Sequence, residues 1–185
     1  LARLLTTPLA LPETLGFAAP PLRLAALRAP IAEMEFWMAT QRVDVAAVDR
    51  LVCAHTLGGA ARPALRAMQL NGMLKGFIDL VFEHDGRYYV ADYKSNWLGP
   101  DDAAYTAEAL RATMRQARYD LQYALYLVAL HRLLRSRLPD YDYDRHVGGA
   151  LYLFLRASPG SGHGLYADRP PRALIEALDR LFAGN

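Results

Sequence analysis

The sequence predicts an α/β fold in which helices flank a mixed β-sheet, and three observations support this. The Asp85-Gly86 pair separates two alternating apolar runs within 72–95, one of the best short signals for an antiparallel hairpin. A second apolar run, 146–156, follows a long helical pattern that leaves room for the crossover connection of a parallel strand pair. Strand and helix patterns are interspersed along the whole chain, as in layered α/β domains.

Local patterns define the elements before the hairpin. Residues 1–9 read as helix, and the proline-punctuated segment 8–30 is expected to be irregular with a helical turn. Apolar and polar side chains alternate through 31–40, which predicts a strand. Asp44 is a suitable N-cap for a helix over 44–56.

Beyond the hairpin, the segment 97–101 contains Gly and Pro and is expected to end the strand. Two helices are predicted, over 102–115 and 117–137. The apolar stripe of the second helix is formed by Leu121, Leu125 and Val128. A buried strand is predicted over 146–156, followed by a Gly/Ser loop. The last helix opens at Pro170-Pro171 and ends near Gly184.

Composition limits the classes of protein that fit. A chain of 185 residues with 53% hydrophobic content can bury one sizeable core, so residues 1–185 are expected to form a single domain. The formal net charge of +2 does not indicate a strongly basic nucleic-acid coat, so any DNA contact would come from a local patch. The single Cys53 excludes an internal disulfide and fits a reducing compartment. No apolar run has the length of a membrane span, about 18 residues, and no signal peptide is seen.

The hairpin carries the candidate catalytic and metal-binding residues. Only two of the 21 basic side chains are lysines, Lys75 and Lys94, and both lie in the stretch that carries Asp79 and Asp92, although chance could also place them there. A two-residue turn at Asp85-Gly86 sets Asp79 directly opposite Asp92, with Lys94 on the same face. Like charges in that position repel, and burial makes two carboxylates costlier still.

Three arrangements could relieve this repulsion: a shared proton, a lysine partner or a bound cation. Carboxylate oxygens, with a backbone carbonyl and water, suit Mg²⁺ or Mn²⁺ better than zinc. Lys94 could then position a water molecule or offset charge on a phosphate. The alternative without function is a buried Lys–Asp salt bridge, although one lysine cannot satisfy two buried acids.

The predicted helix over 117–137 carries a second candidate surface. Gln122 and Tyr126 are four residues apart and share a face, and Arg115 and Tyr119 extend this stripe. Such a polar and aromatic face could contact phosphates or stack on bases. Alternatively, these tyrosines are core residues. The other arginines are expected on a solvated helix surface: Arg111, Arg118, Arg132, Arg135 and Arg137.

Across residues 72–126, the motifs GFIDLVF, DYKSNWLG and QYALY resemble the nuclease domain of RecB-type helicase–nucleases (exodeoxyribonuclease V) and, more broadly, the PD-(D/E)XK nucleases. The resemblance extends from about residue 33 to the last helix. It implies a restriction-endonuclease-like core with Asp79 and Asp92 as Mg²⁺ ligands, joined by the Tyr93 main-chain carbonyl. Lys94 would be the catalytic lysine, while Gln122 and Tyr126 match the family's helix motif near the DNA phosphate.

The chain departs from this family's pattern in two respects. RecB-type nucleases complete the metal site with a histidine on a helix upstream of the first strand, whereas the first histidine here is His55. The chain is therefore expected to be a fragment whose upstream helix precedes Leu1, with weak metal affinity and low or no activity. It also contains no Gly-rich phosphate loop ending in Gly-Lys-Ser/Thr, so no helicase motor is expected in it.

The resemblance implies Mg²⁺-dependent DNA hydrolysis in double-strand break repair and recombination. The implied partners are DNA, RecC-like and RecD-like subunits and the RecA recombinase, in the bacterial cytoplasm without membrane association. A second hypothesis is a catalytically inactive interaction module that docks partner subunits or a recombinase. A two-carboxylate hydrolase such as a glycosidase fits less well, because Lys94 and the Gln-x-x-x-Tyr helix have no clear role in it.

Overall fold

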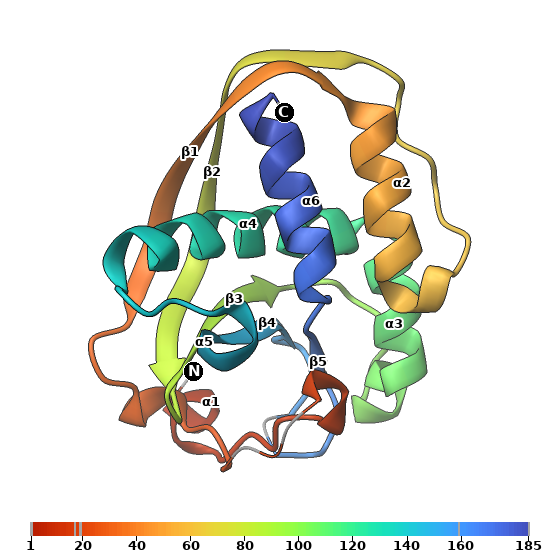
Figure 1. Cartoon of the computed structure of the whole chain (residues 1–185). Coiled ribbons are helices and arrows are strands. Elements are labelled where there is room, and N and C mark those ends of the chain that lie inside the picture. The colour runs from red at the N-terminus through yellow and green to blue at the C-terminus, as the bar shows by residue number, and fades with distance from the viewer. Residues whose placement is uncertain (1, 17, 19, 159, 185) are drawn as a thin grey trace. The chain divides into compact units, whose positions relative to one another are not determined.

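A computed structural model describes residues 2–16, 18, 20–158 and 160–184, and its elements are labelled in Figure 1. The strands are β1 (Ile31–Asp44), β2 (Gln69–His84), β3 (Arg87–Lys94), β4 (Val147–Phe154) and β5 (Leu165–Asp168). The helices are α1 (Ala2–Thr6), α2 (Val45–His55), α3 (Ala107–Gln116), α4 (Tyr119–Arg137), α5 (Tyr143–His146) and α6 (Arg172–Ala183). No helix of the described residues is long and apolar enough to cross a membrane.

The strands form a mixed sheet in the order β1-β2-β3-β4-β5. The β2–β3 and β4–β5 pairs are antiparallel, whereas β3 and β4 run parallel. The connection from β3 to β4 contains α3 and α4, as the predicted crossover requires. The α/β prediction with a mixed sheet is thus confirmed. The sequence pattern does not predict the four-residue strand β5, because its segment directly follows the Gly/Ser loop and is too short to show an alternating pattern.

The chain forms two compact units, each built from three segments. The first unit comprises Leu1–Met34, Ile78–Thr113 and His146–Arg169. The second unit comprises Glu35–Phe77, Met114–Arg145 and Pro170–Asn185.

The hairpin between β2 and β3 has the predicted register. Its five ladder pairs run from Leu80 opposite Ala91 to His84 opposite Arg87. Asp85 and Gly86 both have positive φ, 52° and 74°, as a two-residue type I′ turn requires.

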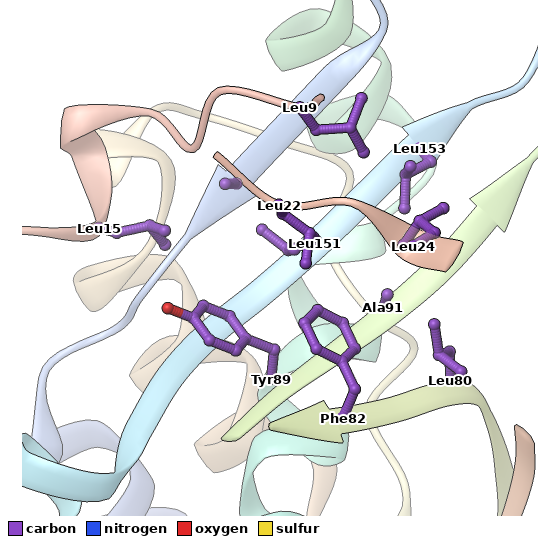
Figure 2. Packing of buried hydrophobic residues seen from close by; sticks show 11 residues of the cluster. Leu9, Leu15, Leu22, Leu24, Leu80, Phe82, Tyr89, Ala91, Leu151 and Leu153 are labelled. Carbon is purple, nitrogen blue, oxygen red and sulfur yellow. The ribbon is translucent and has the colours of Figure 1, made fainter. Parts of the chain in front are cut away.

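The irregular N-terminal segment covers one face of the sheet in the first unit (Figure 2). Leu9 and Leu22 exchange backbone hydrogen bonds of 2.7 and 2.8 Å and lie over the sheet together with Leu15 and Leu24. The sheet contributes Ala167 of β5 and alternate residues of β2, β3 and β4 to this cluster: Leu80, Phe82, Tyr89, Ala91, Leu151 and Leu153. The other residues of β2 and β3 therefore project from the opposite face.

Helices α2, α4 and α6 pack against one another in the second unit (Figure 1). Asp44 caps α2 as predicted, since its carboxylate accepts a hydrogen bond from the Ala46 N–H at 2.9 Å. The predicted stripe of α4 is partly wrong: Val128 is buried, but Leu121 and Leu125 are only half-buried. Most of this helix is buried around its circumference, so no single stripe marks its packing face.

The two middle helices differ in extent from the prediction. A short 3₁₀ turn, Asp102–Tyr105, precedes α3, and α3 begins only at Ala107. Arg118 has a φ of 56° and separates α3 from α4. The reason lies in its side chain, which donates to Pro63 O at 2.6 Å and pairs with Asp49 at 2.7 Å.

Candidate functional site

Asp79 and Asp92 lie at the ends of the paired region of β2 and β3. The ladder reaches Leu80 opposite Ala91, and one further step along both strands sets Asp79 opposite Asp92. The Tyr93 N–H donates to Asp79 Oδ2 at 2.9 Å, which fixes this carboxylate beside β3. Leu80 and Ala91, the neighbours of these acids on their strands, point to the face that the N-terminal segment covers. Both acids therefore project from the other face of the sheet.

Asp92 is buried and has a cationic neighbour. Lys94 Nζ approaches Asp92 Oδ2 at 2.6 Å, an ion-pair distance, although the direction of approach is not that of a regular hydrogen bond. The Lys94 side chain is only 12% exposed. The Lys–Asp salt bridge that the sequence offered as an alternative is therefore present, while Asp79 is held by a backbone N–H instead.

Tyr152 completes the surroundings of Lys94. It lies on β4 directly opposite Asp92 in the parallel pair, and its side chain is buried. Lys94 Nζ sits 5.2 Å from the centroid of its ring, within the range of a cation–π interaction. The ammonium group thus lies close to both a carboxylate and an aromatic ring. Sequence reasoning missed Tyr152, because no local pattern indicates which strand pairs with β3.

The pKa of Tyr93 is shifted mainly by burial and secondarily by the acidic site. Burial raises the pKa of the Tyr93 phenol above its ordinary value, and the nearby Asp79 charge raises it further. Tyr93 therefore stays neutral at physiological pH.

The carboxylates of Asp79 and Asp92 supply hard oxygen atoms at this site, and Tyr93, whose N–H contacts Asp79, follows Asp92 directly in the chain. Within the described residues, no group of three or more His, Cys, Asp and Glu side chains is placed to hold a metal ion. A cation here would thus depend on two carboxylates, backbone oxygen and water. Mg²⁺ accepts this kind of environment, since it binds through one or two carboxylates and retains several waters.

The predicted helix residues are only partly brought together. Gln122 Nε2 donates to Tyr126 Oη at 2.7 Å, which confirms that these two share a face of α4. Tyr126 is buried and meets Phe36 edge-on, with ring centroids 6.0 Å apart. Tyr119 is the first residue of α4, but Arg115 belongs to α3. The continuous four-residue stripe is therefore wrong, because the left-handed backbone at Arg118 interrupts it.

The two lysines of the 72–96 stretch have different roles. Lys75 pairs with Glu35 at 3.1 Å, and both side chains are about 40% exposed. Its ammonium group also lies over the rings of Trp37 and Phe77. An ion pair as exposed as this contributes little to stability.

Comparison with known proteins places this site in context. The family model described as the PD-(D/E)XK nuclease superfamily matches residues 14–183. RecBCD enzyme subunit RecB of Escherichia coli K12 is 52% identical over 155 residues, which cover 82% of this chain and 13% of that protein. RecBCD enzyme subunit RecB of Haemophilus influenzae is 46% identical over 154 residues, with the same coverage.

RecBCD enzyme subunit RecB of Mycobacterium tuberculosis H37Rv is 44% identical over 138 residues, which cover 70% of this chain and 12% of that protein. The chain thus spans about an eighth of the length of these relatives.

Proposed function

The chain belongs to the PD-(D/E)XK nuclease superfamily, and from this membership we propose that it hydrolyses DNA phosphodiester bonds with Mg²⁺ or Mn²⁺. The observation that carries the proposal is the arrangement of Asp79, Asp92 and Lys94. Two acids project from neighbouring strands, and the only lysine of the first unit lies against one of them. This is the donor set that a metal-dependent phosphodiesterase needs.

The wider role follows from the relatives. Their names describe them as RecB subunits of the RecBCD enzyme. We infer that this chain is the nuclease domain of a RecBCD-type helicase–nuclease in DNA repair and recombination in the bacterial cytoplasm. Its partners would be DNA, RecC-like and RecD-like subunits and the RecA recombinase.

The chain's own residues divide the work of the reaction. Asp79, Asp92 and the Tyr93 carbonyl would hold the metal ion, and Gln122 would contact the DNA while the buried Tyr126 holds the Gln122 amide through their hydrogen bond. When bound, the ion lowers the pKa of a coordinated water and offsets negative charge on the phosphate. Lys94 would donate a hydrogen bond to the attacking water or to a phosphate oxygen whose charge grows in the transition state. Its contacts with Asp92 and the Tyr152 ring would keep the Lys94 ammonium group beside the acids.

A nuclease assay with Mg²⁺ on single-stranded and duplex DNA tests the proposal. The chain is compared with Asp79→Ala, Asp92→Ala and a version extended toward the N-terminus. We expect Asp92→Ala to abolish cleavage in both lengths, and the extended protein to cleave faster and bind Mg²⁺ more tightly. Cleavage retained by Asp92→Ala would refute the site, and equal robust activity in both lengths would refute the expectation of an upstream ligand.

Substitutions of Lys94 test whether a compact ammonium group is required. Removal of one preorganised donor typically costs about 10²–10³ in rate, so Lys94→Gln should lower kcat by about that factor. Lys94→Arg should not restore it, because the planar guanidinium does not reproduce the compact point charge of the ammonium group beside Asp92. Lys75→Gln, at the exposed ion pair with Glu35, is the matched control and should leave kcat unchanged. Full activity in Lys94→Arg would contradict this role.

One observation favours a catalytically inactive interaction module as a second candidate. Each acid already has a partner within the protein, since Asp92 contacts Lys94 and Asp79 accepts from Tyr93 N–H. Isothermal titration calorimetry with Mg²⁺ and Mn²⁺ separates the two candidates. Metal binding that disappears in Asp79→Ala supports the nuclease, whereas no metal binding by the N-terminally extended protein supports the module.

A further inference from the structure

The carboxyl ends of the parallel strands β3 and β4 lie next to each other in the first unit. Phe154, the last residue of β4, is opposite Lys94, the last residue of β3. The Leu155 N–H then donates to Lys94 O at 2.9 Å, so the segments that follow β3 and β4 leave the sheet side by side. In open α/β sheets, ligands bind in the crevice outside the carboxyl ends of such strands.

Arg156 lies at this end of the sheet, and a hydrogen bond to the main chain fixes the direction of its side chain. Its Nε donates to Ser95 O at 2.8 Å, directly after Lys94, while the residue itself is exposed. Among the contacts of the described residues, none engages its two terminal nitrogens. The loop is anchored on its far side, where the Ser158 N–H donates to Asp102 Oδ1 at 2.7 Å. A planar guanidinium held in this way presents a fork that matches a phosphate group.

Trp97 is presented on the other loop, two residues after Ser95. Its 67% exposure is the largest among the exposed large hydrophobic side chains of the described residues. The loop beneath it is fixed by buried Tyr105, whose Oη accepts from Leu98 N–H at 3.2 Å and donates to Asn96 O at 3.3 Å. An indole ring exposed on a fixed loop offers an aromatic face for stacking at little cost in conformational entropy.

We propose that Trp97 and Arg156 form a binding site for single-stranded DNA, in which Trp97 stacks on an unpaired base and Arg156 binds a backbone phosphate. The reason for a single strand is that bases inside a duplex are already stacked on both faces, whereas an unpaired base has a face free for an aromatic ring. The inference rests on the proposed function for the identity of the ligand as DNA. It adds the two side chains that would hold the strand.

Tryptophan fluorescence can test the stacking directly, because the chain has only two tryptophans, Trp37 and Trp97. The test uses the chain with Trp37→Phe, so that Trp97 is the only emitter, and with Asp92→Asn to prevent cleavage in Mg²⁺. Titration with a 12-nucleotide oligothymidylate should quench the emission, and a duplex of equal length should quench it less. In the matched protein with Trp97→Phe, the remaining Trp37 should not respond.

Affinities for the same oligonucleotide test both residues in the Asp92→Asn chain. Trp97→Ala should weaken binding about tenfold or more, whereas Trp97→Phe, which keeps a ring, should recover most of it. Arg156→Gln should weaken binding and lower the salt dependence by about one phosphate contact, with Arg156→Lys in between. Trp37→Ala, at the other exposed tryptophan, should leave the affinity unchanged.

The outcomes separate this inference from the proposed function. If the unsubstituted chain cleaves DNA while Trp97→Ala and Arg156→Gln bind single strands like the parent, the inference is overturned and the nuclease assignment stands. Equal quenching by single-stranded and duplex DNA would overturn the preference for single strands. If neither the chain nor its N-terminally extended form binds or cleaves DNA, both are overturned, and Trp97 would then be a contact for a protein partner.

Discussion

Asp120 and its arginine partners show how single side chains fasten the second unit. The Asp120 carboxylate is fully buried and accepts from Arg62 Nη1 at 2.7 Å and from Arg118 Nε at 3.1 Å. Arg62 is 1% exposed and also donates to the carbonyls of Thr56 and Ala60. Arg118, predicted on a solvated surface, is instead 10% exposed within this network. The network joins the loop after α2 to the start of α4.

Removal of Asp120 should destabilise the protein strongly. Asp120→Ala leaves Arg62 buried with no carboxylate partner, and breaking a buried pair in this way costs about 3–5 kcal/mol. Urea unfolding followed by circular dichroism measures the loss. Arg50→Ala removes an exposed pair with Asp44 and should change the free energy of unfolding by less than about 1 kcal/mol. Equal effects in the two variants would contradict the network's structural role.

At the scale of elements, the β2–β3 hairpin determines where the acids of the site lie. The side-chain period of a strand is two, so a one-residue slip would move Asp79 to the other face of the sheet. The Asp85-Gly86 turn prevents this, because a type I′ turn fixes the pairing of the residues that flank it. The Gly86 N–H also donates to Glu83 Oε1 at 2.7 Å, which ties the turn to β2.

Gly86→Ala tests this turn. Gly86 has a φ of 74°, and a Cβ in the left-handed region costs about 1–2 kcal/mol. We expect the free energy of unfolding to fall by about that amount in thermal or urea denaturation. Asp85 also has a positive φ, which glycine adopts without strain. Asp85→Gly should therefore lower the free energy of unfolding much less than Gly86→Ala. A Gly86→Ala protein as stable as the parent would show that the turn tolerates another conformation.

At the scale of the whole molecule, arginine serves the packing of the chain more than its net charge. The 19 arginines and two lysines are nearly balanced by 19 acids, giving +2 overall, and several arginines form internal ion pairs. On α4, Arg132 and Arg135 both bind Asp179 of α6. Burial alone would raise the pKa of Asp179, but hydrogen bonds from these two arginines outweigh it and hold the pKa below its ordinary value. The Asp179 contribution to stability is present above about pH 4 and is lost as pH falls further.

His131 should give the molecule a pH dependence in a separate window. It is buried, its Nδ1 lies 2.8 Å from Tyr141 Oη, and burial together with the charge of Arg135 lowers its pKa below the ordinary 6.5. Because the unfolded chain takes up a proton on this histidine first, the free energy of unfolding should fall as pH drops below about 6.5.

The prediction is measured by urea unfolding between pH 5 and 7.5. His131→Gln has no titrating group at this position, so its stability should decline less than that of the parent as pH falls. One proton accounts for at most about 1.4 kcal/mol per pH unit of this difference. Asp179 does not contribute in this window, because its carboxylate titrates at lower pH. Parallel curves for the two proteins would refute the assignment to His131.

The sequence by itself determined the hairpin, the capped α2, the last helix, the buried β4 and the pair of acids with Lys94. Each depends on neighbours in the chain: an Asp-Gly turn, an N-cap, a period of two residues or an apolar run. The long helical pattern before residue 146 allowed a parallel strand pair, but only the tertiary structure decided that β3 is the partner of β4, in the register that places Tyr152 beside Lys94. The tertiary structure also decided the break between α3 and α4 at Arg118, whose side chain pairs with Asp49 of α2, far away in the sequence. It likewise decided the packing of the N-terminal segment over the sheet. These features could not be predicted because they depend on contacts between residues far apart in the sequence, whose energies no local pattern encodes.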